Sequence, residues 1–324
     1  MTIFGTLLVG KHGLLAQGRA IQVTSNNIVN ASTPGYTRQR AVFEPVTPTF
    51  LPSGFPIGGG VNVDRIERVA DAALDAQLQR ERQILSFDEK LEAGLSRIEA
   101  IFDDLGETGL GSSLQTFFER LNDLAVHPEE STVRDAVVQA GLTIASQIRD
   151  ADRRLTQLGI DQNVRIEEIV GEVNTLAKNI AQLNRSIFAK EGAGGVASSL
   201  RDRRDELLRE LGELVDFTTF ERDNGQISVF VGGGFLLVSD EVAGGLTTST
   251  DQTTLTLASP TYLNVFQTLD GQTNGPITNR ITGGALGAAL RLRDDRVEAY
   301  RDSLDEFALT FANRVNTQHL AGYG

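Results

Sequence analysis

Apolar residues recur at every seventh position through the opening of the chain. This stripe comprises Leu7, Leu14, Ile21 and Ile28, with Leu8, Leu15 and Val29 beside it. The spacing predicts one helix of about 28 residues with a coiled-coil-like apolar face. The same segment contains Gly5, Gly10, Gly13 and Gly18. Each glycine costs a helix about 1 kcal/mol relative to alanine, so we expect this helix to become ordered only against a partner.

Prolines and glycines end this pattern and begin a connector. They are Pro34, Pro45, Pro48, Pro52 and Pro56, with glycines at 54 and 58–60. A segment with this many helix breakers is typical of extended or looped chain. Helical spacing of apolar residues returns over residues 64–102, and a shorter pattern predicts a helix over residues 110–125.

The longest helical pattern covers residues 131–190. In its second half, over residues 166–187, the apolar spacings alternate between 3 and 4. The first half has the same period, but its phase is offset by one residue around Gln162, a stutter that would locally unwind a supercoil. Gly159 and Gly171 could interrupt the helix. Because neighbouring helices are available within the chain, we interpret the 166–187 stripe as the core of an internal bundle.

The pattern changes to short strands after a further helix at 198–214. Two apolar stretches, 217–222 and 227–231, flank Asp223-Asn224-Gly225, which is a strong hairpin signal. Further strands are expected at 236–238, within the Thr-rich stretch 247–257, and at 263–269. This region ends near residue 284, and helical spacing returns over residues 286–311.

These elements predict a mainly α protein with a smaller β-rich region, an α+β arrangement of a long-helix bundle or coiled coil plus an amino-terminal helix. We expect four parts along the chain. They are the amino-terminal helix with its Pro/Gly-rich connector at 1–62, the long-helix bundle at 63–215, the small β-rich region at 216–282, and a returning helix of the bundle at 283–324.

The composition narrows the functional class. The 324 residues carry a net charge of -13, so a nucleic-acid binder driven by electrostatics is disfavoured. No apolar run is long enough to cross a bilayer, and no charged region precedes an apolar run at the start. We therefore expect neither membrane insertion nor a cleavable signal peptide. The absence of Cys excludes disulfides, thiolate metal sites and a cysteine nucleophile.

No set of residues in the sequence suggests catalysis. The three histidines, His12, His127 and His319, have no Ser, Asp or second His at a catalytic or ligand spacing. The pairs Asp103-Asp104 and Asp294-Asp295 lie among charged neighbours in or at the end of predicted helices, where a solvated face is the ordinary explanation. None of the Gly-rich stretches has the form of a phosphate-binding loop. We expect no enzyme activity, no cofactor and no metal site.

Four segments resemble bacterial flagellar axial proteins. Residues 25–39 read S-N-N-I-V-N-A-S-T-P-G-Y-T-R-Q, and rod, hook and hook-associated proteins read close to S-N-N-I-A-N-x-x-T-P-G-Y. Residues 58–68 look like the family's G-G-G-V-x-V-x-x-I-x-R segment, which a helix follows. Residues 200–208 resemble the D-x-R-D-x-L stretch of the hook-associated protein 1 family, and residues 283–319 resemble its G-G-x-L-G…N-x-Q-H region.

This resemblance implies a structural subunit of the bacterial flagellum. Family members are exported unfolded by the flagellar type III apparatus and form the hook–filament junction. The implied partners are copies of the chain in a helical ring, hook protein below, a second junction protein and the filament above, and the export apparatus with a chaperone. The implied location is extracellular. Because family members are longer and carry a second amphipathic helix at the carboxyl end, we expect this chain to be an amino-terminal portion or a truncated form.

The residues expected to carry assembly lie in the amino-terminal segment. They are Leu7, Leu14, Ile21 and Ile28 of the stripe, Asn26, Asn27 and Asn30, and Pro34, Gly35 and Tyr36. The stripe has no complementary helix within the chain, so we expect it to pair with another subunit. The asparagines would satisfy neighbouring backbone groups in a packed tube, and the Pro-Gly-Tyr sequence would turn the chain out of the helix.

Two alternative functions fit part of this pattern. Another axial protein, of the hook or distal rod, would share only the first of the four motifs. From a different class, a surface coiled-coil scaffold or adhesin could share the heptads. Such a protein would have no reason to carry the Thr-Pro-Gly-Tyr turn.

Overall fold

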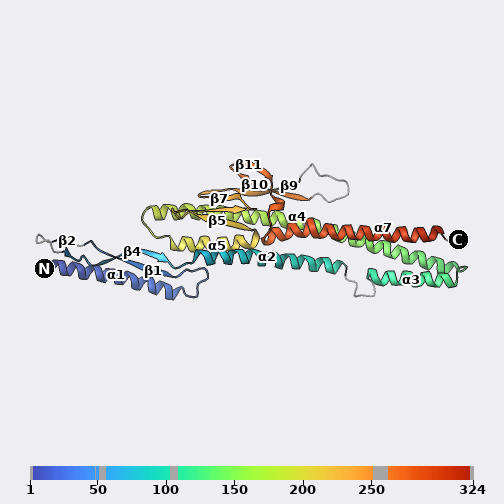
Figure 1. Cartoon of the computed structure of the whole chain (residues 1–324), viewed down its shortest axis with the longest axis horizontal. Coiled ribbons are helices and arrows are strands. Elements are labelled where there is room, and N and C mark those ends of the chain that lie inside the picture. Colours follow the sequence, from blue (N-terminus) through green and yellow to red (C-terminus); the bar gives the residue numbers. More distant parts are fainter. Residues whose placement is uncertain (1–2, 48, 51–55, 103–108, 251–261, 322–324) are drawn as a thin grey trace. The chain divides into compact units, whose positions relative to one another are not determined.

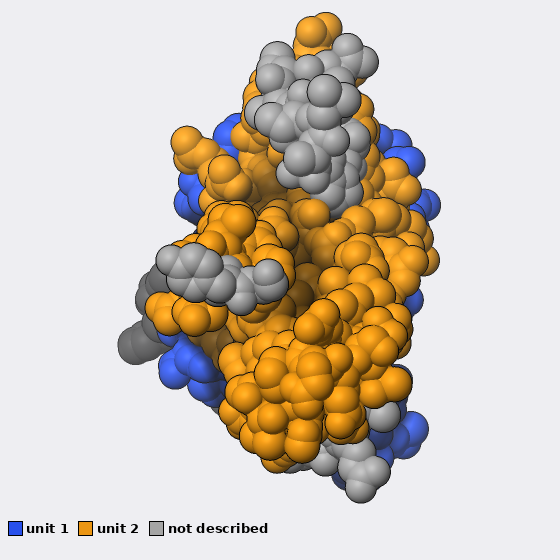
Figure 2. All heavy atoms as spheres, turned by 90° about the vertical axis from the view of Figure 1, so that its right-hand side faces the viewer, with its two compact units in different colours: residues 1–82, 174–212, 217–245 blue, residues 83–173, 213–216, 246–324 orange. Residues whose placement is uncertain are grey.

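The computed structural model describes residues 3–47, 49–50, 56–102, 109–250 and 262–321 (Figure 1). These residues fall into two compact units, which Figure 2 shows in different colours. Unit 1 comprises residues 1–82, 174–212 and 217–245, and unit 2 comprises residues 83–173, 213–216 and 246–324. The fold is mainly α with smaller β-sheets, which confirms the predicted class.

The elements follow the predicted order along the chain. The helices are α1 (Ile3–Val29), α2 (Ala72–Ile101), α3 (Leu110–Val126), α4 (Ser131–Gly192), α5 (Ser198–Leu214), α6 (Gly284–Arg291) and α7 (Glu298–Ala321), with a 3-10 turn η2 (Thr278–Arg280) and a π-helical turn η3 (Leu292–Val297). The strands are β1 (Gln39–Pro45), β2 (Thr49–Phe50), β3 (Pro56–Ile57), β4 (Val61–Arg68), β5 (Phe217–Glu221), β6 (Ile227–Val231), β7 (Phe235–Ser239), β8 (Val242–Ala243), β9 (Gly245–Thr250), β10 (Leu263–Leu269) and β11 (Gln272–Pro276).

In unit 1, α1 packs against the antiparallel pair β1–β4. Ala16 and Val23 are buried on this inner face of the helix. Gly60, at a φ of +87°, lies so close to α1 that an added Cβ would come within 3.2 Å of the Val9 carbonyl oxygen. The partner that this glycine-weakened helix needs is therefore a pair of strands in its own chain.

The predicted helix over residues 64–102 is wrong at its start, because β4 ends at Arg68 and α2 begins at Ala72. Residues 61–68 pair antiparallel with β1 across the connector, with a shift of register between Val42 and Phe43. The ladder hydrogen bonds of β4 come from β1, on the other side of the connector, and a local apolar period does not reveal them. The strand predicted within the Thr-rich stretch 247–257 corresponds to β9, which ends at Thr250. Residues 251–257 lie outside the described residues.

The remainder of unit 1 combines the end of α4 and most of α5 with a four-stranded antiparallel sheet in the order β5-β6-β7-β8. Its buried apolar residues include Ile180, Ile187, Leu207, Leu211, Val229, Val231, Leu237 and Val238. The predicted hairpin is confirmed, with β5 and β6 paired from Phe217 to Val231. Gly225 in its turn has a φ of +79°, a conformation that favours glycine.

In unit 2, α2, α4, η3 and α7 share a hydrophobic core cluster. Its fully buried members are Ile98, Leu155, Leu158, Leu292, Val297 and Leu304. The helix α4 runs through Gly159 and Gly171 without a break. At Gly159 the missing side chain makes room for Tyr262, whose Oη would lie 2.5 Å from an added Cβ. The glycine therefore serves close packing and does not interrupt the helix.

The 166–187 stripe of α4 packs inside the chain. Ile166, Ile169, Val173, Ile180 and Ile187 have no exposed surface. Such complete burial confirms the interpretation of this stripe as an internal core. It also explains why α4 persists across the stutter, since both phases of the apolar pattern find packing partners.

Candidate assembly site

The predicted stripe of α1 faces away from the strands that hold the helix. Leu7, Leu14, Ile21 and Ile28 are each between 65% and 77% exposed, and Leu8, Leu15 and Val29 are exposed beside them. The α1 helix therefore has two faces, a small-residue face on β1–β4 and a large apolar face left open. A contiguous exposed apolar surface of this kind is typical of a protein interaction site.

The asparagines of the first motif make hydrogen bonds within their own chain. Asn27 Nδ2 donates to the carbonyl oxygen of Gln39 at 2.8 Å, and Asn27 Oδ1 accepts from Tyr36 Oη and from the Gln39 amide, each at 2.9 Å. Asn30 Nδ2 donates to the carbonyl oxygen of Asn26 at 2.9 Å. Asn27 thus fixes the end of α1 to the beginning of β1, and contacts of the three asparagines with another subunit stay a prediction.

The Pro34-Gly35-Tyr36 turn packs against α5. Gly35 has a φ of +79°, and an added Cβ would lie 3.1 Å from Glu206 Oε2 and 3.3 Å from an Arg209 guanidinium nitrogen. Burial raises the pKa of Tyr36, and the neighbouring Asp202 carboxylate raises it further. The turn leads the chain out of α1, as predicted, and in addition lies on a second helix.

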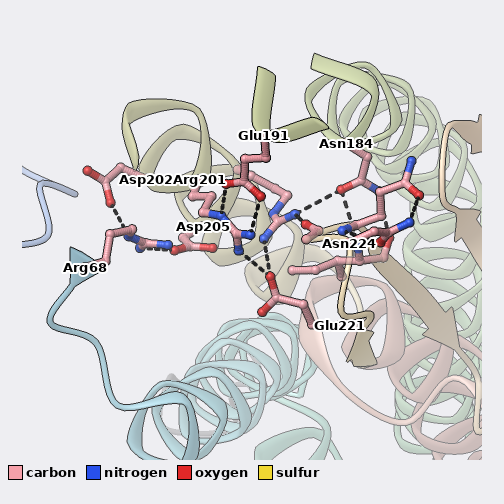
Figure 3. Close-up of polar contacts among 12 residues, drawn as sticks. Arg68, Asn184, Glu191, Arg201, Asp202, Asp205, Glu221 and Asn224 are labelled. Carbon is pink, nitrogen blue, oxygen red and sulfur yellow. Dashed lines mark hydrogen bonds and ion pairs between the residues drawn. The ribbon is translucent and has the colours of Figure 1, made fainter. Parts of the chain in front are cut away.

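Arg68, at the end of β4, also binds to α5, through ion pairs with two aspartates (Figure 3). Its Nε lies 3.0 Å from Asp202 Oδ1, and its Nη2 lies 2.5 Å from Asp205 Oδ2. Arg68 Nη2 also donates to Thr37 Oγ1 at 3.0 Å, and the Thr37 amide lies 3.4 Å from Asp202 Oδ2. We call these four residues, Thr37, Arg68, Asp202 and Asp205, the Arg68 clamp.

The Arg68 clamp joins three of the four sequence motifs. Thr37 belongs to the 25–39 motif, Arg68 ends the 58–68 motif, and the two aspartates lie in the 200–208 motif. The sequence identified each segment but not their contact. No spacing in the sequence indicates that these three segments meet.

A second polar cluster is formed by arginines of the same turns of α5 (Figure 3). Arg201 contacts Glu191 with its Nε at 2.8 Å and Glu221 with its Nη1 at 2.5 Å. The hydrogen bond from Arg201 lowers the pKa of Glu191, and the same contact raises the pKa of the guanidinium. This cluster ties the end of α4 and the strand β5 to α5.

Arg204 and Asn184 extend this cluster into the core. Arg204 is 1% exposed, and its Nη1 donates to Gly225 O at 2.6 Å and to Asn184 Oδ1 at 3.1 Å. Burial lowers the pKa of Arg204. Asn184 Nδ2 donates to the carbonyl oxygens of Ile227 and Asp240, both at 2.7 Å. Together these side chains bind the hairpin β5–β6 to the helices.

Two of the residues considered for chemistry, His12 and Asp294, have partners within the chain. His12 Nδ1 lies 3.2 Å from the Gly59 carbonyl oxygen, and Asp294 accepts from Arg293 Nε at 2.6 Å. Asp103 and Asp104 lie outside the described residues. Within the described ranges, no group of three His, Cys, Asp or Glu side chains is placed to hold a metal ion. The helices of those ranges include none with the length and hydropathy to cross a membrane.

Comparison with known proteins identifies the family. Residues 95–324 match the family model described as the flagellar hook-associated protein FlgK helical domain, and residues 7–37 match that of the flagella basal body rod protein. The chain belongs to the FlgK family of flagellar hook-associated proteins. The resemblance seen in the sequence to the hook-associated protein 1 family is thereby confirmed.

Relatives within the FlgK family extend beyond this chain. Flagellar hook-associated protein 1 of Salmonella typhimurium is 31% identical over 315 residues, which cover 96% of this chain and 56% of that protein. The Escherichia coli K12 protein is 30% identical over 318 residues, with the same two coverages. The chain thus spans a little over half the length of these relatives.

A solved FlgK structure shares the fold. The flagellar hook junction protein FlgK from Burkholderia pseudomallei superposes with a TM-score of 0.63, covering 75% of this chain and 43% of that chain at 24% identity. At this level of identity the likeness concerns the fold.

Proposed function

We propose that this protein is a structural, non-catalytic subunit of the bacterial flagellum that assembles at the hook–filament junction and permits filament assembly. The observation that carries the proposal is the match of residues 95–324 to the FlgK helical domain. The exposed stripe of α1 supports it, because a large apolar face with no partner in the described chain requires one from outside.

The proposed partners follow from this role. Copies of the chain form one helical layer, the helical ring, through head-to-tail contacts. Such contacts do not close on themselves, and they therefore build tubes from identical subunits. Hook protein lies below, and the second junction protein and the filament lie above. The chain leaves the cell through the flagellar export apparatus with the help of a chaperone, without a cleavable signal peptide, and functions outside the cell.

A rod or hook subunit is the second candidate. The rod protein FlgG of Buchnera aphidicola is 38% identical over 77 residues, but these cover only 20% of this chain. The amino-terminal match to the rod protein family is confined to residues 7–37. The amino-terminal motif is therefore compatible with both candidates. The match of residues 95–324 to the FlgK helical domain favours the junction protein.

Electron microscopy of cells lacking the gene, with an assay for flagellin in the medium, tests the proposal. Intact hooks without filaments, with flagellin lost to the medium, are the expected result. Missing hooks would move the protein to the rod or hook. Normal flagella would overturn a role in the axial structure.

A further inference from the structure

The side chain of Asn27 takes the place of a neighbouring strand at the beginning of β1. Its Nδ2 donates to the Gln39 carbonyl oxygen at 2.8 Å, and its Oδ1 accepts from the Gln39 amide at 2.9 Å. Two residues that exchange both of these bonds form the hydrogen-bonded pair of an antiparallel ladder. On the opposite edge, next to β4, the Arg38 carbonyl oxygen accepts from the Val69 amide at 2.8 Å. One side-chain amide therefore continues the ladder from β1 to α1.

This contact requires a side chain that donates and accepts at once. Asn27 Oδ1 also accepts from Tyr36 Oη at 2.9 Å, so the amide oxygen receives two hydrogen bonds while the amide nitrogen donates one. A carboxylate of the same shape has no hydrogen to donate, and it would face the Gln39 carbonyl oxygen with a negative charge. Of the two isosteric polar side chains, only asparagine makes all three bonds.

The contact of Asn27 leads on to α5. Gln39 lies opposite Arg68 in the register of β1 and β4, and Arg68 is paired with Asp202 and Asp205 of α5 at 3.0 Å and 2.5 Å. A continuous set of contacts thus runs from the carboxyl end of α1 through two strands to α5, and all of it lies in unit 1. The apolar contacts in the middle of α1 hold the helix on the strands but are not directional.

The direction of α1 at Asn27 determines where its apolar stripe lies. Twenty positions separate Leu7 from Asn27, which is about 30 Å of helix. A tilt of about 10° at Asn27 would move Leu7 by about 5 Å. Neighbouring side chains on a helix surface lie about 5–6 Å apart, so such a tilt would misplace the far end of the stripe by one side chain.

We propose that Asn27 is the positioning residue of the assembly surface. It acts within its own chain and fixes the direction of α1, and with it the apolar stripe, relative to β1, β4 and α5. The adjacent Asn26 is exposed, and its side chain makes no hydrogen bond within the described residues. Asn26 is therefore the one of the two that is available to another subunit. This inference rests on the proposed function, which requires the stripe to meet a neighbouring subunit.

Distances between two spin labels in the isolated chain measure this direction. The chain has no Cys, so labels on Lys11→Cys in α1 and Arg203→Cys in α5, both at exposed positions of unit 1, are specific. In Asn27→Asp the distance distribution should shift or broaden by about 5 Å. Asn26→Asp places the same charge in the same last turn of α1, so it is the matched control and should leave the distribution unchanged.

Filament counts connect the direction of α1 to assembly. Asn27→Asp should lower the number of filaments per cell about tenfold, the change in equilibrium expected when a partly buried polar group loses its partner. Tyr36→Phe removes one of the three bonds and should have a smaller effect on both the distances and the filaments. A role in stability alone would lower the melting temperature and leave the distances in the folded chain unchanged.

Three results would overturn the inference. Unchanged distances in Asn27→Asp would show that the amide does not set the direction of α1, and a loss of filaments in that variant would then assign Asn27 to a contact with another subunit. Equal shifts in Asn26→Asp would assign the effect to charge at the helix end. Displaced labels with normal filaments would separate the direction of α1 from assembly. Normal flagella in cells lacking the gene would overturn the proposed function, whereas the distances in the isolated chain do not depend on it.

Discussion

Arg68 Nη2 lies 2.5 Å from Asp205 Oδ2, although 137 residues separate the two in the sequence. The Arg68 side chain is 16% exposed, so water screens this pair much less than a surface ion pair. The same guanidinium reaches Asp202 and Thr37, and one side chain therefore fixes the end of β4 and the beginning of β1 to α5.

Removing the guanidinium should destabilise unit 1. Arg68→Ala leaves two aspartates facing each other without a cation, and we expect a loss of about 1–3 kcal/mol in the free energy of unfolding. Urea denaturation followed by circular dichroism measures it. Arg40→Ala, which removes an exposed ion pair with Glu67, is the control and should change stability by less than about 1 kcal/mol. Equal losses in the two variants would mean that the Arg68 clamp stabilises the fold no more than an exposed ion pair does.

The turn at Gly35 should not accept a side chain. Its φ of +79° and the 3.1 Å approach of Glu206 predict that Gly35→Leu costs about 1–3 kcal/mol and displaces the turn from α5. Hydrogen exchange should then increase in α1, β1 and β4, and remain unchanged in the hairpin β5–β6. Gly18→Ala, in a helix with nothing near the added Cβ, should instead stabilise α1. Unchanged exchange in Gly35→Leu would refute the docking of this turn.

The two faces of α1 should respond oppositely to a charge. Leu14→Glu lies on the exposed stripe, so the melting temperature should stay within about 1–2 °C of the wild type while filaments are lost. Ala16→Glu buries a carboxylate against β1–β4 and should lower the melting temperature strongly. Thermal melts and counts of filaments per cell measure the two effects. Normal filaments in cells with Leu14→Glu would contradict a role of the stripe in assembly.

Acid should weaken the second polar cluster. The pKa of Glu191 is lowered in the folded chain by Arg201, so the folded state binds this proton less readily than the unfolded state. The stabilisation is complete above the unfolded pKa of about 4.3 and is lost as the pH falls through the lower folded pKa. Glu191→Gln should flatten the pH dependence of unfolding in this window. The Glu168→Gln variant, at an exposed helical ion pair, is the control and should retain the dependence.

The order and type of the helices were predictable because their information is local. In α4 the apolar spacing alone determines which side of the helix is buried, and the buried isoleucines are those that the period selects. The hairpin at Asp223-Asn224-Gly225 was predictable for the same reason, since the turn itself requires a residue that tolerates a positive φ.

The strand β4 was missed because its partner is not local. Val61–Arg68 becomes a strand only because β1 supplies ladder hydrogen bonds across the connector. Likewise, a helix was the only kind of partner that the apolar stripe of α1 predicted. The inner face of α1, with Ala16 and Val23, packs instead on the strand pair β1–β4.

The sequence by itself determined the helices, the hairpin, the family motifs and the apolar stripe of α1, because each depends on residues within a few turns of one another. Only the tertiary structure decided which face of α1 stays open, and only it brought Thr37, Arg68 and Asp205 together. Charged side chains pair across any sequence separation once the backbone has folded, and no spacing rule in the sequence encodes the partner that each one finds.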